Sequence, residues 1–213
     1  MLIDGHPRNF EQLSRSNRAA KKVQAAVCKP GRNVTMPDYN DKGWGSGLVS
    51  VLEYNTPAYA NTWKKMVNTN SLFHMPCRGL SEILADTGTP VPVDFLTIDV
   101  QGAEDAVLES AELGLVGGGP TAFKVVLVEA ESTAMGKNVR VRKMLEAAGL
   151  KKLKHEIVRP FHASYNELYV RPDLVALNDP RPSQNVELNP RGILARFLNG
   201  VRATPDVWGH NKA

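Results

Sequence analysis

Apolar residues along this chain fall into short continuous runs, separated by stripes at helical spacing. The clearest runs cover 93–98 and 123–128, and both are rich in branched side chains. Continuous runs of this length are typical of parallel strands buried on both faces. Between them, Ala103, Val107 and Ala111 recur at helical spacing on one face, which predicts a helix.

Weaker versions of the same patterns extend along the rest of the chain. They predict further strands at 1–4, 23–28, 71–77, 153–158 and 167–170, and helices at about 7–20, 80–85, 103–114 and 139–148. Alternating strands and helices favour an α/β fold with three layers and a mostly parallel sheet. The last two strands are close in sequence, so they are expected to pair antiparallel at the edge of that sheet.

Two segments lie outside this pattern. Residues 31–70 are irregular and are expected to form a long loop, of the kind that often covers a substrate. Within it, Trp44 and Trp63 either cover a ligand or pack on the sheet edge. The tail at 172–213 is rich in proline and is expected to wrap the surface, which leaves 1–171 as the folded domain.

Composition limits the possible partners. The chain of 213 residues suffices for one full hydrophobic core, and its net charge is +4. Basic residues gather between Lys137 and Arg159, as a solvated face or as a docking surface for an anion. No aromatic residues interleave with them, so nucleic acid is not expected as a partner.

Compartment is judged from hydropathy and cysteine content. No apolar run approaches the ~20 residues of a membrane span, so no membrane segment is expected. Cys28 and Cys77 imply no disulfide framework. The chain is therefore expected to be cytoplasmic, although an upstream targeting segment can be missing from it.

Polar residues with possible chemistry gather where the strands end. Ligands of open α/β sheets bind outside the carboxyl ends of the strands. The candidates at that edge are Asp4, Asp99, Gln101, Gly102, Glu104 and Glu129. The acidic residues have structural alternatives, because Asp caps helices and Glu near a helix N-terminus is favoured by the dipole. His155 and His162 act either as bases or as structural residues, and no His and Cys spacing indicates zinc, so no metal site is predicted.

The segment 94–104, DFLTIDVQGAE, resembles the core motif of the FkbM family of S-adenosylmethionine-dependent methyltransferases. That motif is an Asp-x-Glu-Gly-x-Glu pattern after an apolar strand. Further segments resemble the family in the same order, at 3–13, 25–27, 77–84, 125–129 and 166–170. Gln101 stands where the pattern often has Glu, which removes a negative charge but keeps an acceptor.

The resemblance implies a Rossmann-like methyltransferase fold and S-adenosylmethionine as cofactor. The implied cofactor-binding residues are Asp4, Asp99, Gln101, Gly102 and Glu104, with Asp4 accepting hydrogen bonds from the ribose hydroxyls. The implied catalytic residues are Asp99 and Glu129. Asp99 would orient a substrate hydroxyl, act as general base or join a metal site. The implied reaction is O-methylation of a hydroxyl on a sugar, a glycan or another small metabolite.

The chain departs from the family at its start. The family's first strand and its glycine-rich turn should precede Met1, so the first strand–helix unit is expected to be missing. A second hypothesis is therefore a truncated, non-catalytic methyltransferase-like module that binds a partner, with a homo-oligomer compensating for lost ladder partners. A third is a nucleotide- or nucleic-acid-binding domain that uses the basic residues, which a steep salt dependence of binding would support.

Overall fold

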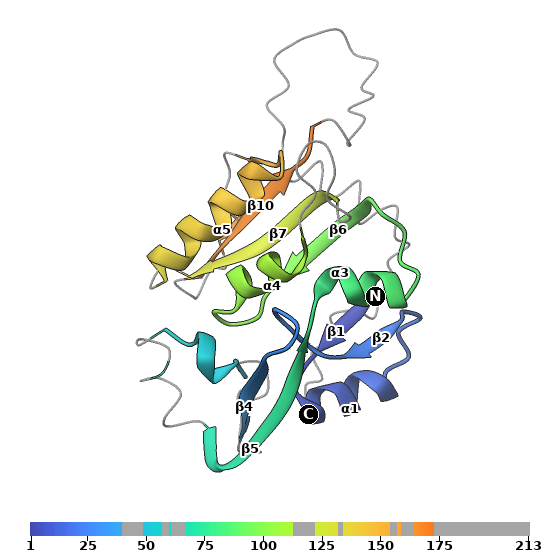
Figure 1. Cartoon of the computed structure of the whole chain (residues 1–213), viewed down its shortest axis with the longest axis vertical. Helices are drawn as coiled ribbons and strands as arrows, with labels where there is room; N and C mark the ends of the chain where they lie inside the picture. The colour runs from blue at the N-terminus through green and yellow to red at the C-terminus, as the bar shows by residue number, and fades with distance from the viewer. Residues whose placement is uncertain are drawn as a thin grey trace, which may run out of the picture.

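A computed structural model of the chain describes residues 1–39, 49–56, 60, 67–112, 122–131, 134–153, 157–158 and 164–172. Strands and helices alternate in a mixed α/β arrangement (Figure 1). The first half contains β1 (Leu2–Asp4), α1 (Pro7–Arg15), β2 (Lys22–Gln24), β3 (Ala26–Val27), β4 (Asn33–Tyr39), η2 (Leu52–Tyr54) and β5 (Val67–Arg78). The second half contains α3 (Leu80–Asp86), β6 (Val93–Ile98), α4 (Glu104–Ser110), β7 (Phe123–Glu131), α5 (Met135–Ala147), β8 (Lys151–Lys152), β9 (Ile157–Val158) and β10 (Ser164–Val170).

The strands form three separate ladders within the described residues. β1 pairs with β2, β3 and β4 flank β5, and β6–β7–β10 continues to β8, with β9 also paired to β10. Four of the seven pairings are antiparallel, so the expectation of a mostly parallel sheet is wrong for this part of the chain. The expected antiparallel pairing of the last strands at the sheet edge is confirmed, because β8 and β9 both pair antiparallel with the outer side of β10. Short strands such as the Lys-Lys pair of β8 are suited to an edge.

β4 lies in the region expected to be irregular. It pairs antiparallel with β5 from Asn33 opposite Pro76 to Tyr39 opposite Val67, with a register shift after Pro37. Val34 and Met36 alternate inward and are buried. This alternation is the signal of a half-buried strand, but proline and neighbouring polar residues obscured it in the sequence.

A disulfide joins Cys28 to Cys77, with their Cα atoms 5.0 Å apart. The parallel pairing of β3 with β5 sets Ala26 opposite Cys77, which brings Cys28 close to it. The expectation that the cysteines imply no disulfide is therefore wrong, because strand register is not visible in a pair of distant cysteines. Disulfides are typical of oxidising compartments, so cysteine usage does not support the expected cytoplasmic setting.

The main core lies between the β6–β7–β10 ladder and the helices α3, α4 and α5, as Figure 1 shows for α4 and α5. Its buried members include Leu84, Ile98, Leu108, Val126, Leu145 and Tyr169. A smaller cluster packs Val125, Leu153, Leu168 and Val170. Because side chains alternate along a strand, Val125 and Val126 enter different clusters, and β7 is buried on both faces.

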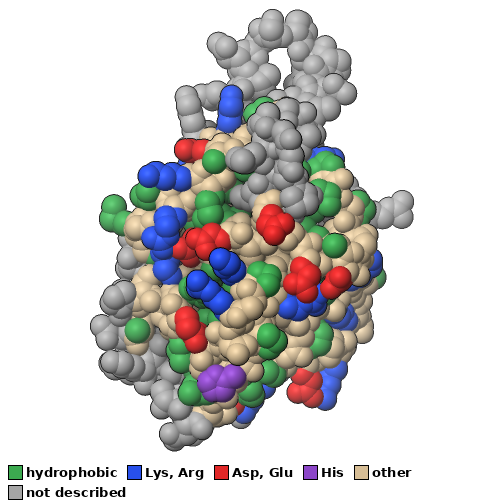
Figure 2. Space-filling model, viewed as in Figure 1, with side chains coloured by type: hydrophobic (Ala, Val, Ile, Leu, Met, Phe, Trp, Pro, Cys, Tyr) green, Lys and Arg blue, Asp and Glu red, His purple; other side chains and the backbone are tan. Residues whose placement is uncertain are grey.

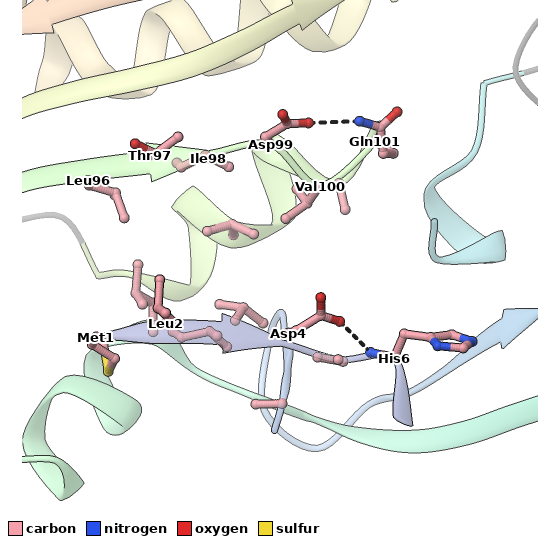
Figure 3. A pocket seen from close by; sticks show the side chains of 18 of the residues that line it. Met1, Leu2, Asp4, His6, Leu96, Thr97, Ile98, Asp99, Val100 and Gln101 are labelled. Atoms are coloured by element: carbon pink, nitrogen blue, oxygen red, sulfur yellow. Dashed lines mark hydrogen bonds between the residues drawn. The ribbon is translucent and has the colours of Figure 1, made fainter. Parts of the chain in front are cut away.

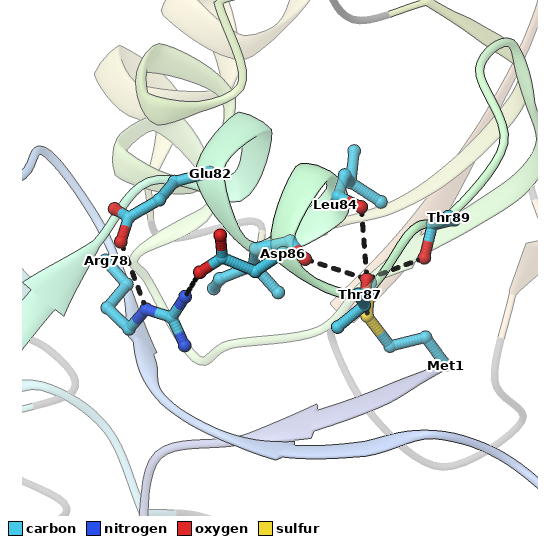
Figure 4. Close-up of polar contacts among 8 residues, drawn as sticks. Met1, Arg78, Glu82, Leu84, Asp86, Thr87 and Thr89 are labelled. Atoms are coloured by element: carbon cyan, nitrogen blue, oxygen red, sulfur yellow. Dashed lines mark hydrogen bonds and ion pairs between the residues drawn. The ribbon is translucent and has the colours of Figure 1, made fainter.

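The C-terminal end of α3 is held by polar contacts that also reach the start of the chain (Figure 4). The hydroxyl of Thr87 donates to the carbonyl oxygen of Ile83 at 2.7 Å and lies 3.6 Å from the sulfur of Met1. Arg78 forms ion pairs with Glu82 and Asp86 at 3.4 and 2.5 Å. The contact between Thr87 and Met1 places the start of the chain beside the C-terminal end of α3.

Glu167 on β10 is a buried carboxylate with several donors. The guanidinium Nε of Arg142 lies 3.1 Å from both its oxygens, and Lys152 Nζ and Tyr169 Oη each donate at 2.7 Å. Burial alone would raise the pKa of Glu167, but these hydrogen bonds outweigh it and lower the pKa to about 2. The ionised form therefore stabilises the contact between α5 and β10.

The pKa of Glu167 predicts a loss of stability in acid. Its folded-state pKa lies below the unfolded value, so its contribution is present above about pH 4.5 and is lost as the pH falls through about 2. A shift of this size corresponds to about 3 kcal/mol of unfolding free energy. Urea unfolding between pH 6 and pH 2 should show a shallower decline for Glu167→Gln than for the wild type. Glu82→Gln, at an exposed ion pair, should follow the wild type, and identical curves for all three would contradict the assignment.

The disulfide predicts a stability difference on reduction. It closes a loop with a sequence separation of 49 residues. The chain-entropy model gives about 4 kcal/mol for a loop of this size. Unfolding in urea with and without reductant should show this loss in the wild type. A Cys28→Ala/Cys77→Ala variant should not respond to reductant, and a wild type equally insensitive would argue against the bond.

Candidate functional site

A cavity of about 610 Å³ opens between β1 and β6. Figure 3 shows the two strands running in the same direction, with Leu2 and Asp4 on one wall and Leu96 and Asp99 on the other. The walls are apolar along the strands and polar where the strands end. The volume is within the range of small-molecule sites, and the polar end is where α/β sheets bind their ligands.

The predicted site residues divide into two groups. Asp4, Asp99 and Gln101 line the cavity, whereas Gly102, Glu104 and Glu129 lie outside its lining. The structure therefore brings together residues from strands that are far apart in the sequence, as expected from their positions at strand ends.

Gln101 links two carboxylates at the ends of neighbouring strands. Its side-chain amide donates to Asp99 Oδ1 at 2.7 Å and to Glu129 Oε2 at 3.2 Å. β6 and β7 are parallel with Ile98 opposite Val128, so the residues that follow both strands lie at one edge. Gln101 has a φ of 55°, a left-handed conformation that is unfavourable for residues other than glycine and is often found at functional sites.

The carboxylate of Glu104 lies against the backbone of the turn that follows β6. Its Oε1 accepts hydrogen bonds from the backbone N–H groups of Gly102 at 3.0 Å and Val100 at 3.3 Å. Burial raises its pKa, while these hydrogen bonds and the nearby Lys137 act in the opposite direction. The carboxylate therefore supports the turn. From its position near the start of a helix alone, this role could not be distinguished from contact with a ligand.

Lys137 and Gly102 join this turn to a second segment. The ammonium group of Lys137 on α5 donates to the carbonyl oxygens of Gly102 and Tyr54. Gly102 has a φ of 99°, and a Cβ there would lie 3.3 Å from the Tyr54 carbonyl oxygen. The left-handed conformation therefore favours glycine at this position, and a side chain would also crowd the Tyr54 carbonyl oxygen.

Asp4 points into the cavity from the opposite wall (Figure 3). Its Oδ1 accepts the backbone N–H of His6 at 2.8 Å. His6, not Asp4, is the N-cap residue of α1, so the capping alternative for Asp4 does not describe this helix. Burial raises the pKa of Asp4, with the hydrogen bond from His6 opposing it.

His6 is a cavity residue that sequence reasoning missed. Its side chain is buried, meets the ring of Phe73 edge-on at 5.1 Å, and lies 3.9 Å from Asp38 Oδ1. Burial lowers its pKa below 6.5, so the imidazole is neutral at pH 7. The sequence signal that could have identified His6 as a site residue is its position two residues after Asp4, at the end of a strand.

Similarity to a known protein family extends over most of the chain. The family model of the methyltransferase FkbM domain matches residues 3–152, which is more than half of the chain. The chain belongs to this family. No curated protein and no solved structure matches it. The match confirms the resemblance inferred from the core motif, and it indicates methyltransferase activity.

Several basic residues of the run that begins at Lys137 have acidic or carbonyl partners inside this FkbM domain. Arg140 Nε donates to Asp105 at 2.9 Å, and Arg142 and Lys152 share Glu167. Figure 2 shows blue and red side chains close together on the face in view. These pairings favour the solvated-face interpretation of the basic run over an anion-docking surface.

Several expectations lie outside the described residues of the FkbM domain. They are Trp44, Trp63, His155, His162, the end of the basic run and the tail from 173 onward. In the part of the chain that the structure describes, no three or more His, Cys, Asp or Glu side chains gather as metal ligands. No helix in the same part is long and apolar enough to cross a membrane.

A carboxylate at position 101 should destabilise the protein, because Gln101 donates hydrogen bonds to the two carboxylates beside it. Gln101→Glu removes the donor shared by Asp99 and Glu129 and adds a like charge, so unfolding free energy at pH 7.5 should fall by about 1–3 kcal/mol. Urea unfolding at pH 7.5 measures this loss. Gln12→Glu, on the exposed side of α1, is the control, and an unchanged Gln101→Glu protein would exclude the bridge as a stabilising contact.

Proposed function

We propose that this FkbM domain binds S-adenosylmethionine at the polar end of the cavity and transfers its methyl group to a hydroxyl oxygen. The observation that carries the proposal is the convergence of Asp4 from β1 with Asp99 and Gln101 after β6 on one cavity. Membership of the family supports methyl transfer in general. Our proposal adds the identity of the cofactor and a hydroxyl oxygen as the methyl acceptor.

The cavity fits the chemistry of the proposed cofactor. A ribose presents hydroxyl donors, and Asp4 offers a carboxylate whose Oδ1 is already held by His6. Apolar side chains such as Leu96 and Ile98 line the interior and suit an aromatic base. A volume of about 610 Å³ accommodates a ligand of this size.

The residues after β6 and β7 would act on the acceptor. S-adenosylmethionine supplies a methyl group on a sulfonium, which is already activated for transfer. Alignment of the acceptor oxygen with that methyl is then the main task of the site. Asp99, held by Gln101, would accept the hydroxyl proton or orient the hydroxyl, and Glu129 would hold Gln101 in place or face the acceptor. The acceptor class that we propose is a sugar, a glycan or another small metabolite.

We also propose that the fold is a three-layer Rossmann-like arrangement without its first strand–helix unit. The separation between the β1–β2 and β6–β7 ladders supports this proposal. It also favours the second candidate function, a non-catalytic module that binds a partner. A cavity open along two strand edges is the feature that this alternative would use.

Calorimetric titration with S-adenosylhomocysteine separates these functions. A folded chain that binds at micromolar levels supports the cofactor site, and Asp4→Asn should weaken binding about tenfold, or about 1.4 kcal/mol. Asp94→Asn is the matched control, because Asp94 is exposed and pairs with Lys124 outside the cavity. No binding by the folded wild type would contradict the proposal.

Turnover tests the role of Asp99. In an acceptor screen with radiolabelled methyl donor, Asp99→Asn should lose transfer while retaining affinity for S-adenosylhomocysteine. Equal turnover in Asp99→Asn and the wild type would remove Asp99 from the mechanism.

A further inference from the structure

Asn33, the first residue of β4, begins the sequence Asn33-Val34-Thr35. An asparagine followed two residues later by threonine, with any residue except proline between them, is the acceptor pattern for N-linked oligosaccharides. No other asparagine in the sequence stands in this pattern. Because a pattern this short also arises by chance, the placement of Asn33 in the fold decides its meaning.

The structure places the Asn33 side chain on the outer face of the β4–β5 ladder. Side chains alternate along a strand, and Val34 and Met36 are buried whereas Asn33 is exposed. Met36 lines the cavity, and Asn33, on the opposite face of the strand, is absent from the lining. A bulky group on Asn33 would therefore leave the cavity open.

The surface around Asn33 can accommodate an oligosaccharide. Strand pairing sets Asn33 opposite Pro76, and alternation along β5 puts Leu72 and His74 on the same outer face. All three of these β5 residues are exposed. Within the described residues, β4 pairs with β5 alone and is an edge strand, which proteins protect from pairing with other chains. A large hydrophilic group beside β4 would give that protection.

The disulfide between Cys28 and Cys77 is an independent sign of the compartment in which N-linked oligosaccharides are attached. Disulfides form in the oxidising compartments of the secretory route, where this modification also takes place. Cys77 follows Pro76, the partner of Asn33, and its backbone N–H donates to the Arg32 carbonyl oxygen at 2.8 Å. The disulfide and the acceptor pattern thus lie at the same end of the β4–β5 ladder.

We propose that Asn33 is an N-glycosylation site. Its carboxamide nitrogen would attack the anomeric carbon of an oligosaccharide carried on a lipid diphosphate. A C–N bond forms, and the bond from that carbon to a diphosphate oxygen breaks with its electron pair remaining on the oxygen. The nitrogen loses one proton, so no oxidant or reductant takes part. The proposal does not depend on methyl transfer.

Mass spectrometry of the natural protein tests this site. The full chain is isolated from its source with an antibody, and the peptide that contains Asn33 is treated with peptide N-glycosidase in heavy-oxygen water. The enzyme removes an N-linked oligosaccharide and converts its asparagine to aspartate, which takes up the heavy oxygen. Most molecules should carry this label at residue 33. Asn17, which is exposed but outside the pattern, should carry none.

Variants of the full chain, secreted from insect cells behind a cleavable signal peptide, show which residues direct the modification. Asn33→Gln and Thr35→Ala should abolish the mass gain of one oligosaccharide. Thr35→Ser should retain it, and it keeps the hydroxyl group that lies 3.2 Å from His74 Nδ1 in the folded protein. Ala19→Thr is the positive control, because it completes the pattern at Asn17 and should add a second oligosaccharide.

Three outcomes would overturn the proposal. The first is a natural chain without label at residue 33. The second is a secreted wild-type chain without an oligosaccharide when the Ala19→Thr variant carries one, since that variant shows that the cells modify this chain. The third is a mass gain that survives Asn33→Gln, which would place the modification at another residue.

Discussion

The parallel pairing of β6 with β7 determines the geometry of the candidate site. It places Ile98 level with Val128, so the turn after one strand and the acidic end of the other meet at the same edge. Gln101 can then reach both carboxylates, and the left-handed backbone at Gln101 and Gly102 returns the chain toward α4. The pairing is secured by burial of β7 on both faces.

The polar groups beneath this edge serve the backbone more than the cavity. Glu104 binds two N–H groups of the turn, and Lys137 binds carbonyl oxygens of the turn and of η2. Opposite charges thus support the turn from two sides. Asp99 and Gln101 are left to face the cavity because Glu104 and Lys137 hold the main chain that carries them.

The sequence predicted the elements whose signals are local. Continuous apolar runs located β6 and β7, and the acidic residues at strand ends indicated Asp4 and Asp99 as neighbours of one site. It could not predict partners set by distant register, which is why the disulfide of Cys28 and the three separate ladders were missed. The sequence also could not show that the Glu104 carboxylate points toward the turn, because this direction depends on the conformation of the turn rather than on residue type.

The disulfide has a consequence for how the two walls of the cavity are tethered. β1 precedes Cys28 and β6 follows Cys77, so the shortest covalent route between the walls crosses the sulfur atoms and bypasses the residues between them. The intervening chain is closed into a ring. Insertions, deletions or a single backbone cut within that ring would leave this covalent tether at its original length.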